Sequence, residues 1–261
     1  MRLNNAAFAF LWLGFVLYAF TLSPPAQPDT FDLIVKLSSG QWEGLNPLVV
    51  TLFNLMGIWP MVYACLALID GKDQSISAWP FVAFSFGVGA FALLPYLALR
   101  VHHPINHLGE KNLAQKNLAQ KSSLAVGEKD PLLKVVDSPW TGRLLLLGAL
   151  ALVGYGVADG HWMANEADFA QQWQTSQFIH VMSLDFCMLC AVVSPLIKSD
   201  MAKRGMENSL LYWMGALVPL FGVLVYLSVR SPLSLNNEPK LDDTPDITLE
   251  KPEDDKTAVS A

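Results

Sequence analysis

The chain alternates long apolar runs with shorter polar ones. A helix needs roughly 20 apolar residues to cross a hydrocarbon core about 30 Å thick. Six runs approach that length, at residues 7–23, 47–69, 80–99, 141–158, 178–197 and 210–229. The runs at 47 and 80 each open on a proline, which suits the first turn of a helix. The pattern therefore predicts an all-α, polytopic membrane protein with about six transmembrane helices.

The polar segments divide the chain into four regions. Residues 1–100 and 141–230 each contain three apolar runs, and we expect each to be a three-helix unit. Between them, residues 101–140 form a polar, low-complexity linker that contains the sequence KNLAQ twice in tandem. Residues 231–261 form an acidic tail, which we expect to be disordered because it is rich in proline and acids.

The two three-helix units resemble each other. The third run ends in Pro-Tyr-Leu-Ala-Leu-Arg at residues 95–100, and the sixth ends in Val-Tyr-Leu-Ser-Val-Arg at residues 225–230. One polar residue inside a run precedes each closing arginine by a similar distance, Asn54 in the first unit and Asp185 in the second. Three crossings leave the chain on the opposite side of the membrane, so the second copy of a three-helix repeat must have the inverted orientation. The sequence therefore predicts two inverted three-helix repeats, as in several transporter folds.

The first unit also resembles a known family. Asn46-Pro47 leads into a run with a polar residue inside it, and Trp79, Ser-Phe-x-x-Gly at 85–89 and Leu-Pro-Tyr-Leu-Ala-Leu-Arg at 94–100 follow. This order is similar to the bacterial three-helix membrane family called domain of unknown function 2834. The second unit keeps the order from about residue 168 to 230, which implies a tandem arrangement in a cyanobacterial or plastid relative. The family implies an architecture and no activity.

Composition narrows the function classes. Only 15% of the residues are charged, against about 25% in soluble domains. The net charge of −6 is concentrated in the tail, so the body lacks the basic field of a nucleic-acid-binding protein. Three cysteines provide no disulfide framework, and Cys187-x-x-Cys190 lies inside an apolar run, where packing is the favoured interpretation. The sequence shows no motif for a cofactor or a metal.

Three polar residues inside the apolar runs are candidates for a functional site: Asp185, Asn54 and His180. A carboxylate at the middle of a bilayer costs about 2.5 to 3.5 kcal/mol on insertion scales. Asp185 is therefore either a proton, cation or catalytic site, or a neutral acid that bonds to a neighbouring helix such as the one bearing Asn54. His180 could bind a pigment or haem, but a single histidine with no supporting motif is usually structural.

The expected role is that of a non-enzymatic integral membrane protein, a partner or assembly protein of a larger membrane complex. A small-solute or ion transporter with a site near Asp185 and Asn54 is the first alternative, and a membrane enzyme acting on a lipid or isoprenoid is the second. The expected partners are the lipid bilayer and other membrane proteins, in a bacterial inner or thylakoid membrane. Counting lysines and arginines under a six-span topology places residues 24–46, 100–140 and 198–209 in the cytosol and both termini outside.

Overall fold

The computed structural model describes residues 3–101, 131–158, 168–231 and 233, and these residues form helices and no strands. Residues 102–130, most of the expected linker, and residues 234–261, most of the expected tail, lie outside the described residues. The first half contains α1 (Leu3–Thr21), α2 (Thr30–Ser39), α3 (Pro47–Asp70), the short 3-10 helix η1 (Gly71–Asp73), α4 (Trp79–Val88) and α5 (Ala90–Leu99). The second half contains α7 (Pro131–Asp137), α8 (Pro139–Ala158), α9 (Phe169–Thr175), α10 (Gln177–Val192), α11 (Ser194–Lys203), α12 (Ser209–Leu217) and α13 (Phe221–Val229).

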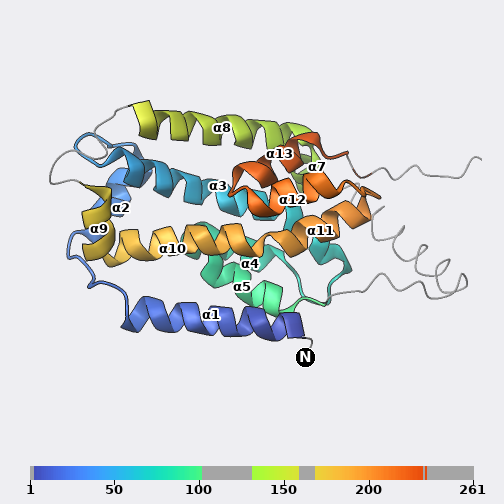
Figure 1. The fold of residues 1–261 in the computed structure, drawn as a ribbon, viewed down its shortest axis with the longest axis horizontal. Helices are drawn as coiled ribbons and strands as arrows, with labels where there is room; N and C mark the ends of the chain where they lie inside the picture. The colour runs from blue at the N-terminus through green and yellow to red at the C-terminus, as the bar shows by residue number, and fades with distance from the viewer. Residues whose placement is uncertain (1–2, 102–130, 159–167, 232, 234–261) are drawn as a thin grey trace, which may run out of the picture.

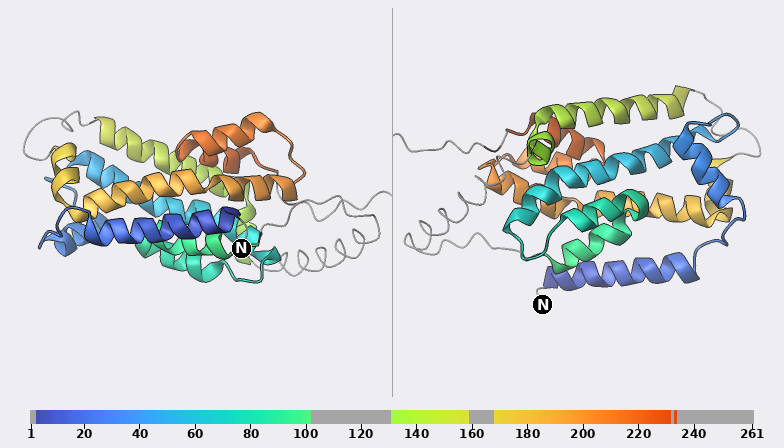
Figure 2. Two further views of the ribbon diagram at one scale, coloured as in Figure 1. Left: turned by 60° about the horizontal axis from the view of Figure 1, so that its bottom comes forward. Right: turned by 180° about the vertical axis from the view of Figure 1, so that it is seen from behind.

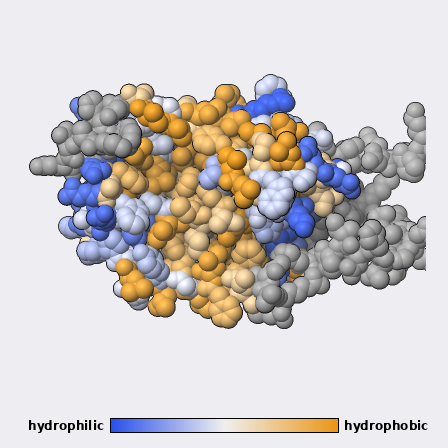
Figure 3. Space-filling view, viewed as in Figure 1, coloured by the Kyte–Doolittle hydropathy of each residue, from blue (hydrophilic) through white to orange (hydrophobic). Residues whose placement is uncertain are grey.

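Three helical segments are long and apolar enough to cross a membrane: α3, α8 and the combined α10 and α11. They lie side by side in one bundle, with α1 along one edge (Figures 1 and 2). The face of the bundle seen in Figure 3 has an apolar band across its middle and polar residues toward both ends. This banding is the surface expected of helices surrounded by lipid, and it supports the prediction of a membrane protein.

The start of α3 shows how the sequence sets a helix boundary. Oδ1 of Asn46 accepts hydrogen bonds from the backbone N–H groups of Leu48 (2.8 Å) and Val49 (3.4 Å). Pro47 occupies the first turn, where a helix needs no backbone donor. Together they satisfy the first N–H groups of the longest helix, which would otherwise lack partners.

The run at residues 80–99 does not form one continuous helix, so the prediction of a crossing there is wrong. It folds as a hairpin of α4 and α5, with Gly89 at the turn at a φ of 52°. The rings of Phe81 and Tyr96, one on each helix, lie 5.7 Å apart between centroids. Arg100 returns to Asp70, at the end of α3, with a contact of 2.5 Å between Nη2 and Oδ1. A continuous helix would separate the ends of this run by about 30 Å.

The run at residues 210–229 differs from the prediction in the same way. α12 and α13 pack as a second hairpin, whose turn contains Leu220 at a φ of 55°. The two helices are so close that a Cβ at Gly222 would overlap the backbone carbonyl of Met214. Arg230 returns to Asp200 on α11, with 3.0 Å between Nη1 and Oδ2. Each helix of a hairpin has ten residues or fewer, about 15 Å of rise, which is half a hydrocarbon core.

The two halves of the bundle run in the same direction, so the prediction that they are inverted is wrong. The hydroxyl of Tyr63 on α3 donates to the carbonyl of Leu189 on α10, and Ser199 on α11 reaches Asp70 at the end of α3. Both contacts join residues at matching heights on parallel helices. α1 and α8 also run in the same direction, away from the end that carries Asp70 (Figure 1). The physical reason is that a hairpin returns the chain to the side from which it left.

The two ends of the bundle differ in charge. One end, called here the basic end, contains Asp70, Arg100, Asp200 and Arg230. Among the described residues it holds every lysine and arginine except Lys36, which lies on α2 at the opposite end. The predicted sidedness is therefore wrong, because residues 24–46 lie at the end opposite to the 198–209 loop.

The last part of the segment expected to be a linker contains a helix. Helix α7 begins at Pro131, and Val136 within it is buried. The repeated KNLAQ sequence and the acidic tail lie outside the described residues, so their expected disorder stays a prediction.

Candidate functional site

Asp185 lies inside the bundle at the turn of the first hairpin. It is the ninth residue of α10, about 22 Å along the helix axis from Asp200. Its side chain is 5% exposed, and Oδ1 accepts a hydrogen bond of 2.8 Å from the backbone N–H of Ala90, the first residue of α5. The N-terminus of a helix carries partial positive charge and unpaired N–H groups, so a carboxylate stabilises it. Asp185 thus acts as an N-cap supplied by a different helix.

Gly89 allows this approach. Its φ of 52° and ψ of −125° lie where residues with a side chain are strained. A Cβ at residue 89 would also overlap the carboxylate of Asp185. The hairpin turn and the buried acid are therefore one unit, in which the glycine provides both the backbone conformation and the space.

Asn54 and Asp185 do not pair. The side-chain amide of Asn54 donates to the carbonyl of Val50, one turn earlier on the same helix, at 2.8 Å. Asn54 is only partly buried. The structure thus gives Asn54 a local bond within α3 and gives Asp185 a different partner, the backbone of α5.

Both ring nitrogens of His180 have partners. Nδ1 lies 2.9 Å from the carbonyl of Trp173 and Nε2 lies 2.8 Å from the hydroxyl of Tyr18. Because a carbonyl only accepts, Nδ1 carries the proton, and Nε2 accepts from Tyr18 in the neutral ring. The imidazole also packs against the Trp173 ring in a tilted arrangement, with 4.2 Å between centroids. His180 therefore joins α1 to α9 and α10, and neither nitrogen is left for a metal. In the described part of the chain, no group of three His, Cys, Asp or Glu side chains could hold a metal ion.

Aromatic side chains fill the space between the two halves near Asp185. Trp59 and Tyr63 on α3 are fully buried, as is Leu189 on α10. The Trp59 ring packs edge-on against Phe186, with 6.1 Å between centroids, and the Tyr63 hydroxyl donates 2.8 Å to the Leu189 carbonyl. This part of the interface is packed with side chains that contact each other directly.

Two clusters of charged residues lie at the basic end, and each contains an aspartate, a tyrosine and an arginine. In the first, Asp70 accepts from Nε of Arg100 (2.9 Å) and from the hydroxyl of Tyr96 (2.8 Å). Ser199, from the other half, donates a further bond of 2.8 Å to Asp70. The aspartate ends a long helix, and the tyrosine and arginine come from the second helix of the following hairpin. The cluster therefore fixes the hairpin against the long helix.

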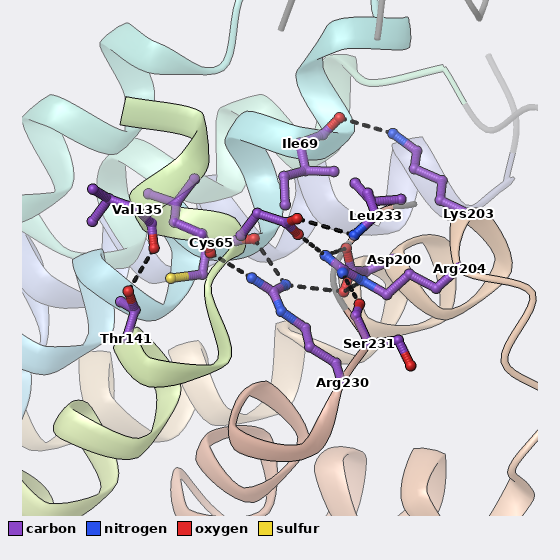
Figure 4. Close-up of polar contacts among 12 residues, drawn as sticks. Cys65, Ile69, Val135, Thr141, Asp200, Lys203, Arg204, Arg230, Ser231 and Leu233 are labelled. Atoms are coloured by element: carbon purple, nitrogen blue, oxygen red, sulfur yellow. Dashed lines mark hydrogen bonds and ion pairs between the residues drawn. The ribbon is translucent and has the colours of Figure 1, made fainter. Parts of the chain in front are cut away.

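The second cluster repeats these contacts 130 residues later. Asp200 accepts from Arg230 (3.0 Å) and from the hydroxyl of Tyr226 (2.6 Å). Here a second arginine takes part, because Arg204 also donates to Asp200 (2.9 Å) and to Asp137 of α7 (2.6 Å) (Figure 4). Burial by itself would lower the pKa of Arg204. Its hydrogen bonds to Asp200 and Asp137, together with the negative charges of both, outweigh burial and raise that pKa above its ordinary value. Arg204 is therefore a permanent cation.

Arg230 also connects the second cluster to the neighbouring helices. Nη1 donates to the carbonyl of Cys65 on α3 (3.1 Å), and Nη2 donates to the carbonyl of Val136 on α7 (2.5 Å) (Figure 4). Through these bonds one guanidinium group joins elements from both halves. In the first cluster, by contrast, Arg100 bonds through its side chain to Asp70 alone among the described residues.

The sequence analysis missed both aspartates of these clusters. The spacing of 130 residues was visible in the closing tyrosines and arginines, and the same spacing relates Asp70 to Asp200. Applying it to every acid would have found the pair. Asn54 and Asp185 were chosen as counterparts because they lie deeper in the apolar runs, but the residue 130 positions before Asp185 is Leu55.

Comparisons with known proteins add no relative. No protein-family model matches the chain, and no match is found among curated proteins or solved structures.

Proposed function

We propose that this chain is a multi-pass integral membrane protein with a non-enzymatic role, a partner or assembly subunit of a membrane complex. The proposal rests on the observation that the buried polar groups make structural contacts between helices. Asp185 caps α5, His180 joins α1 to α10, and the charged clusters fix the hairpins. Trp59 and Tyr63 fill the interface where a transported solute would need space.

The proposed membrane arrangement has four crossings and two re-entrant hairpins. α1, α3, α8 and the combined α10 and α11 cross, whereas the hairpins enter from the basic end and return to it. The equal spacing of the two clusters supports an origin by duplication, with both copies in the same orientation. The resemblance to the bacterial three-helix family, and a location in a bacterial inner or thylakoid membrane, are part of the same proposal.

The positive-inside rule gives the proposed orientation. Because the basic end carries nearly all the described lysines and arginines, we place it in the cytosol together with both ends of the described chain. Single cysteines at Ser77 and Glu207, in a chain without native cysteines, should then react with an impermeant reagent from the cytosolic side. A cysteine at Ser38 on α2 should react from the opposite side. Labelling of Ser38 and Glu207 from the same side would contradict the arrangement.

Two measurements test the proposed role. Purified protein in sealed liposomes should give proton and cation fluxes equal to those of empty liposomes. In mild detergent extracts of native membranes, the tagged chain should migrate on a native gel in a complex larger than its own monomer. Flux through the liposomes, or a chain that migrates only as a monomer, would contradict the role of a partner subunit.

The transporter remains the second candidate, because a buried carboxylate at the turn of a broken helix is a feature of ion sites in transporters. The variant Asp185→Asn separates the two functions. If Asp185 binds a proton or cation, the variant will be folded and will lose flux. If Asp185 only caps α5, the variant will assemble with its partners as the native chain does. The third function, an enzyme acting on a lipid or isoprenoid, receives no support from the contacts of the described residues.

A further inference from the structure

The elbow between α7 and α8, residues 131–144, is held firmly against the bundle. Arg230 donates to the carbonyl of Val136, and the hydroxyl of Thr141 donates to the carbonyl of Val135 at 2.5 Å (Figure 4). Asp137 forms an ion pair of 2.6 Å with Arg204. Two of these bonds join the segment to Arg230 and Arg204 of the bundle, and the third joins α7 to α8. Val136 is buried, whereas several other side chains of the segment are exposed.

The outward side of the elbow combines apolar and cationic groups. Leu132 and Val135 are 55% and 59% exposed, and Trp140 is 67% exposed. Lys134 and Arg143 are also exposed, and the guanidinium carbon of Arg143 lies 4.7 Å from the centroid of the Trp140 ring. A cation in this position is attracted to the ring face, so Arg143 has a preferred place on the surface.

The charges on this surface are all of one sign. Asp137 is the only acid among the described residues of the elbow, and it is directed toward Arg204 and the backbone N–H of Leu233. No ion pair joins Lys134 or Arg143 to an acid of the described chain. The elbow therefore presents two cations, an indole and two aliphatic side chains to its surroundings.

The depth of the elbow fits the headgroup region of a bilayer. It lies at the basic end of the bundle, where it contacts Arg230, and α8 continues from it toward the opposite end (Figure 1). Tryptophan and amphipathic helices favour this region, because their apolar parts contact acyl chains while their polar parts remain hydrated. In the described part of the first half, α1 runs without a break from Leu3, and Asn5 near its start donates to the carbonyls of Ala98 and Arg100.

We propose that this elbow is a binding site for the headgroup of an anionic phospholipid. Arg143 and Lys134 contact the phosphate, Trp140 holds Arg143 in position, and Leu132 and Val135 contact the first methylene groups of the acyl chains. The proposal goes beyond the proposed function and rests on its membrane location only. Charge complementarity selects an anionic headgroup, and the aliphatic pair selects a lipid over a free phosphate ion.

The test compares phosphatidylglycerol with phosphatidylcholine as ligands of the full chain in detergent. Native mass spectrometry counts the bound lipids during titration. The native chain should bind phosphatidylglycerol more tightly than phosphatidylcholine. Removing each cation near a membrane surface costs about 1 kcal/mol, or about fivefold in affinity, so Lys134→Gln with Arg143→Gln should weaken phosphatidylglycerol binding by about 30-fold.

Matched variants distinguish this site from a general charge effect. Lys36→Gln removes an exposed cation on α2 at the opposite end and should leave the affinity unchanged, and Arg143→Lys should retain most of it. Leu132→Ser with Val135→Ser should weaken lipid binding, and glycerol phosphate should fail to compete. Equal affinity for both lipids, an effect of Lys36→Gln as large as that of the double variant, or competition by glycerol phosphate would overturn the proposal. Extraction of the chain from membranes by alkaline carbonate would instead contradict the proposed membrane protein itself.

Discussion

The two hairpins have the same outline but are stabilised differently at their turns and at their bases. At the turn of the first, Gly89 adopts a positive φ and Asp185 of the other half caps α5. At the turn of the second, Leu220 adopts the positive φ, and its apolar side chain makes no capping bond to α13. On the long helix of the first half, Leu55 takes the position that corresponds to Asp185. The two turns therefore follow similar backbone paths but are stabilised by different contacts.

At the bases of the hairpins, where the charged clusters lie, the second hairpin makes more contacts than the first. Asp70 is paired with one arginine, whereas Asp200 is paired with two, Arg204 and Arg230. The first hairpin has the stronger turn and the simpler base, and the second has the plainer turn and the more connected base. The difference teaches that a repeated hairpin can be fixed from either end. The following variants test this interpretation in order of expected effect.

The largest effect should come from Arg100→Met. This change leaves Asp70 buried without its arginine, and breaking a buried ion pair typically costs about 3 to 5 kcal/mol. Arg230→Met should cost less, about 1 to 3 kcal/mol, because Arg204 still compensates Asp200 and the main loss is the bonds to two carbonyl groups. Unfolding in increasing dodecyl sulfate, followed by helical circular dichroism, measures both. A larger loss for Arg230→Met would show that its links to Cys65 and Val136 dominate.

Gly89→Ala should cost about 2 to 4 kcal/mol of unfolding free energy. The alanine would have to adopt a backbone conformation that disfavours a side chain, and its Cβ would displace Asp185. Gly87→Ala is the matched control, because a Cβ there meets open space, and alanine favours a helix over glycine. The same unfolding assay applies, and equal stability of the two variants would refute the role assigned to Gly89.

Asp185→Leu makes the first turn resemble the second and should cost about 1 to 2 kcal/mol. The backbone N–H of Ala90 would lose its acceptor in a buried place. Asp185→Asn keeps an acceptor oxygen and should cost less than half as much. If the asparagine variant is as unstable as the leucine variant, the negative charge at the start of α5 is what stabilises the turn.

The smallest effect should come from Asn54→Leu, within about 0.5 kcal/mol of the native chain. Among the described residues, the Asn54 amide bonds only to a carbonyl of its own helix, and that carbonyl keeps its place in the helix when the amide is removed. A thermal unfolding curve by circular dichroism is sufficient. A loss comparable to that of Asp185→Leu would mean that Asn54 makes a contact across the bundle.

The helical class and most helix positions could be predicted because apolar runs and proline positions report local structure. α3 begins at Pro47 as predicted. The hairpins could not be predicted in this way. A 20-residue apolar run favours lipid whether it crosses or folds back, and only contacts distant in sequence, such as Arg100 with Asp70, distinguish the two.

The candidate site was predicted in part for the same reason. Hydropathy marks Asp185 as a buried acid, and the structure buries it. Its partner is a backbone N–H, however, and a backbone group has no signature in the sequence. The bond between Tyr18 and His180 joins residues 162 positions apart, so no local pattern could indicate it.

The hairpins also affect how the chain would be inserted during synthesis. In the proposed arrangement both hairpins return to the basic end, so the connections to be moved across the lipid are the segment between α1 and α3 and the one between α8 and α9. The first contains Lys36 as its only lysine or arginine, and residues 159–168 contain none. In that proposed orientation the cationic groups, which are the most costly to translocate, stay on the side where the ribosome works. The proposed arrangement would thereby spare the insertion machinery from moving most lysines and arginines of the described chain.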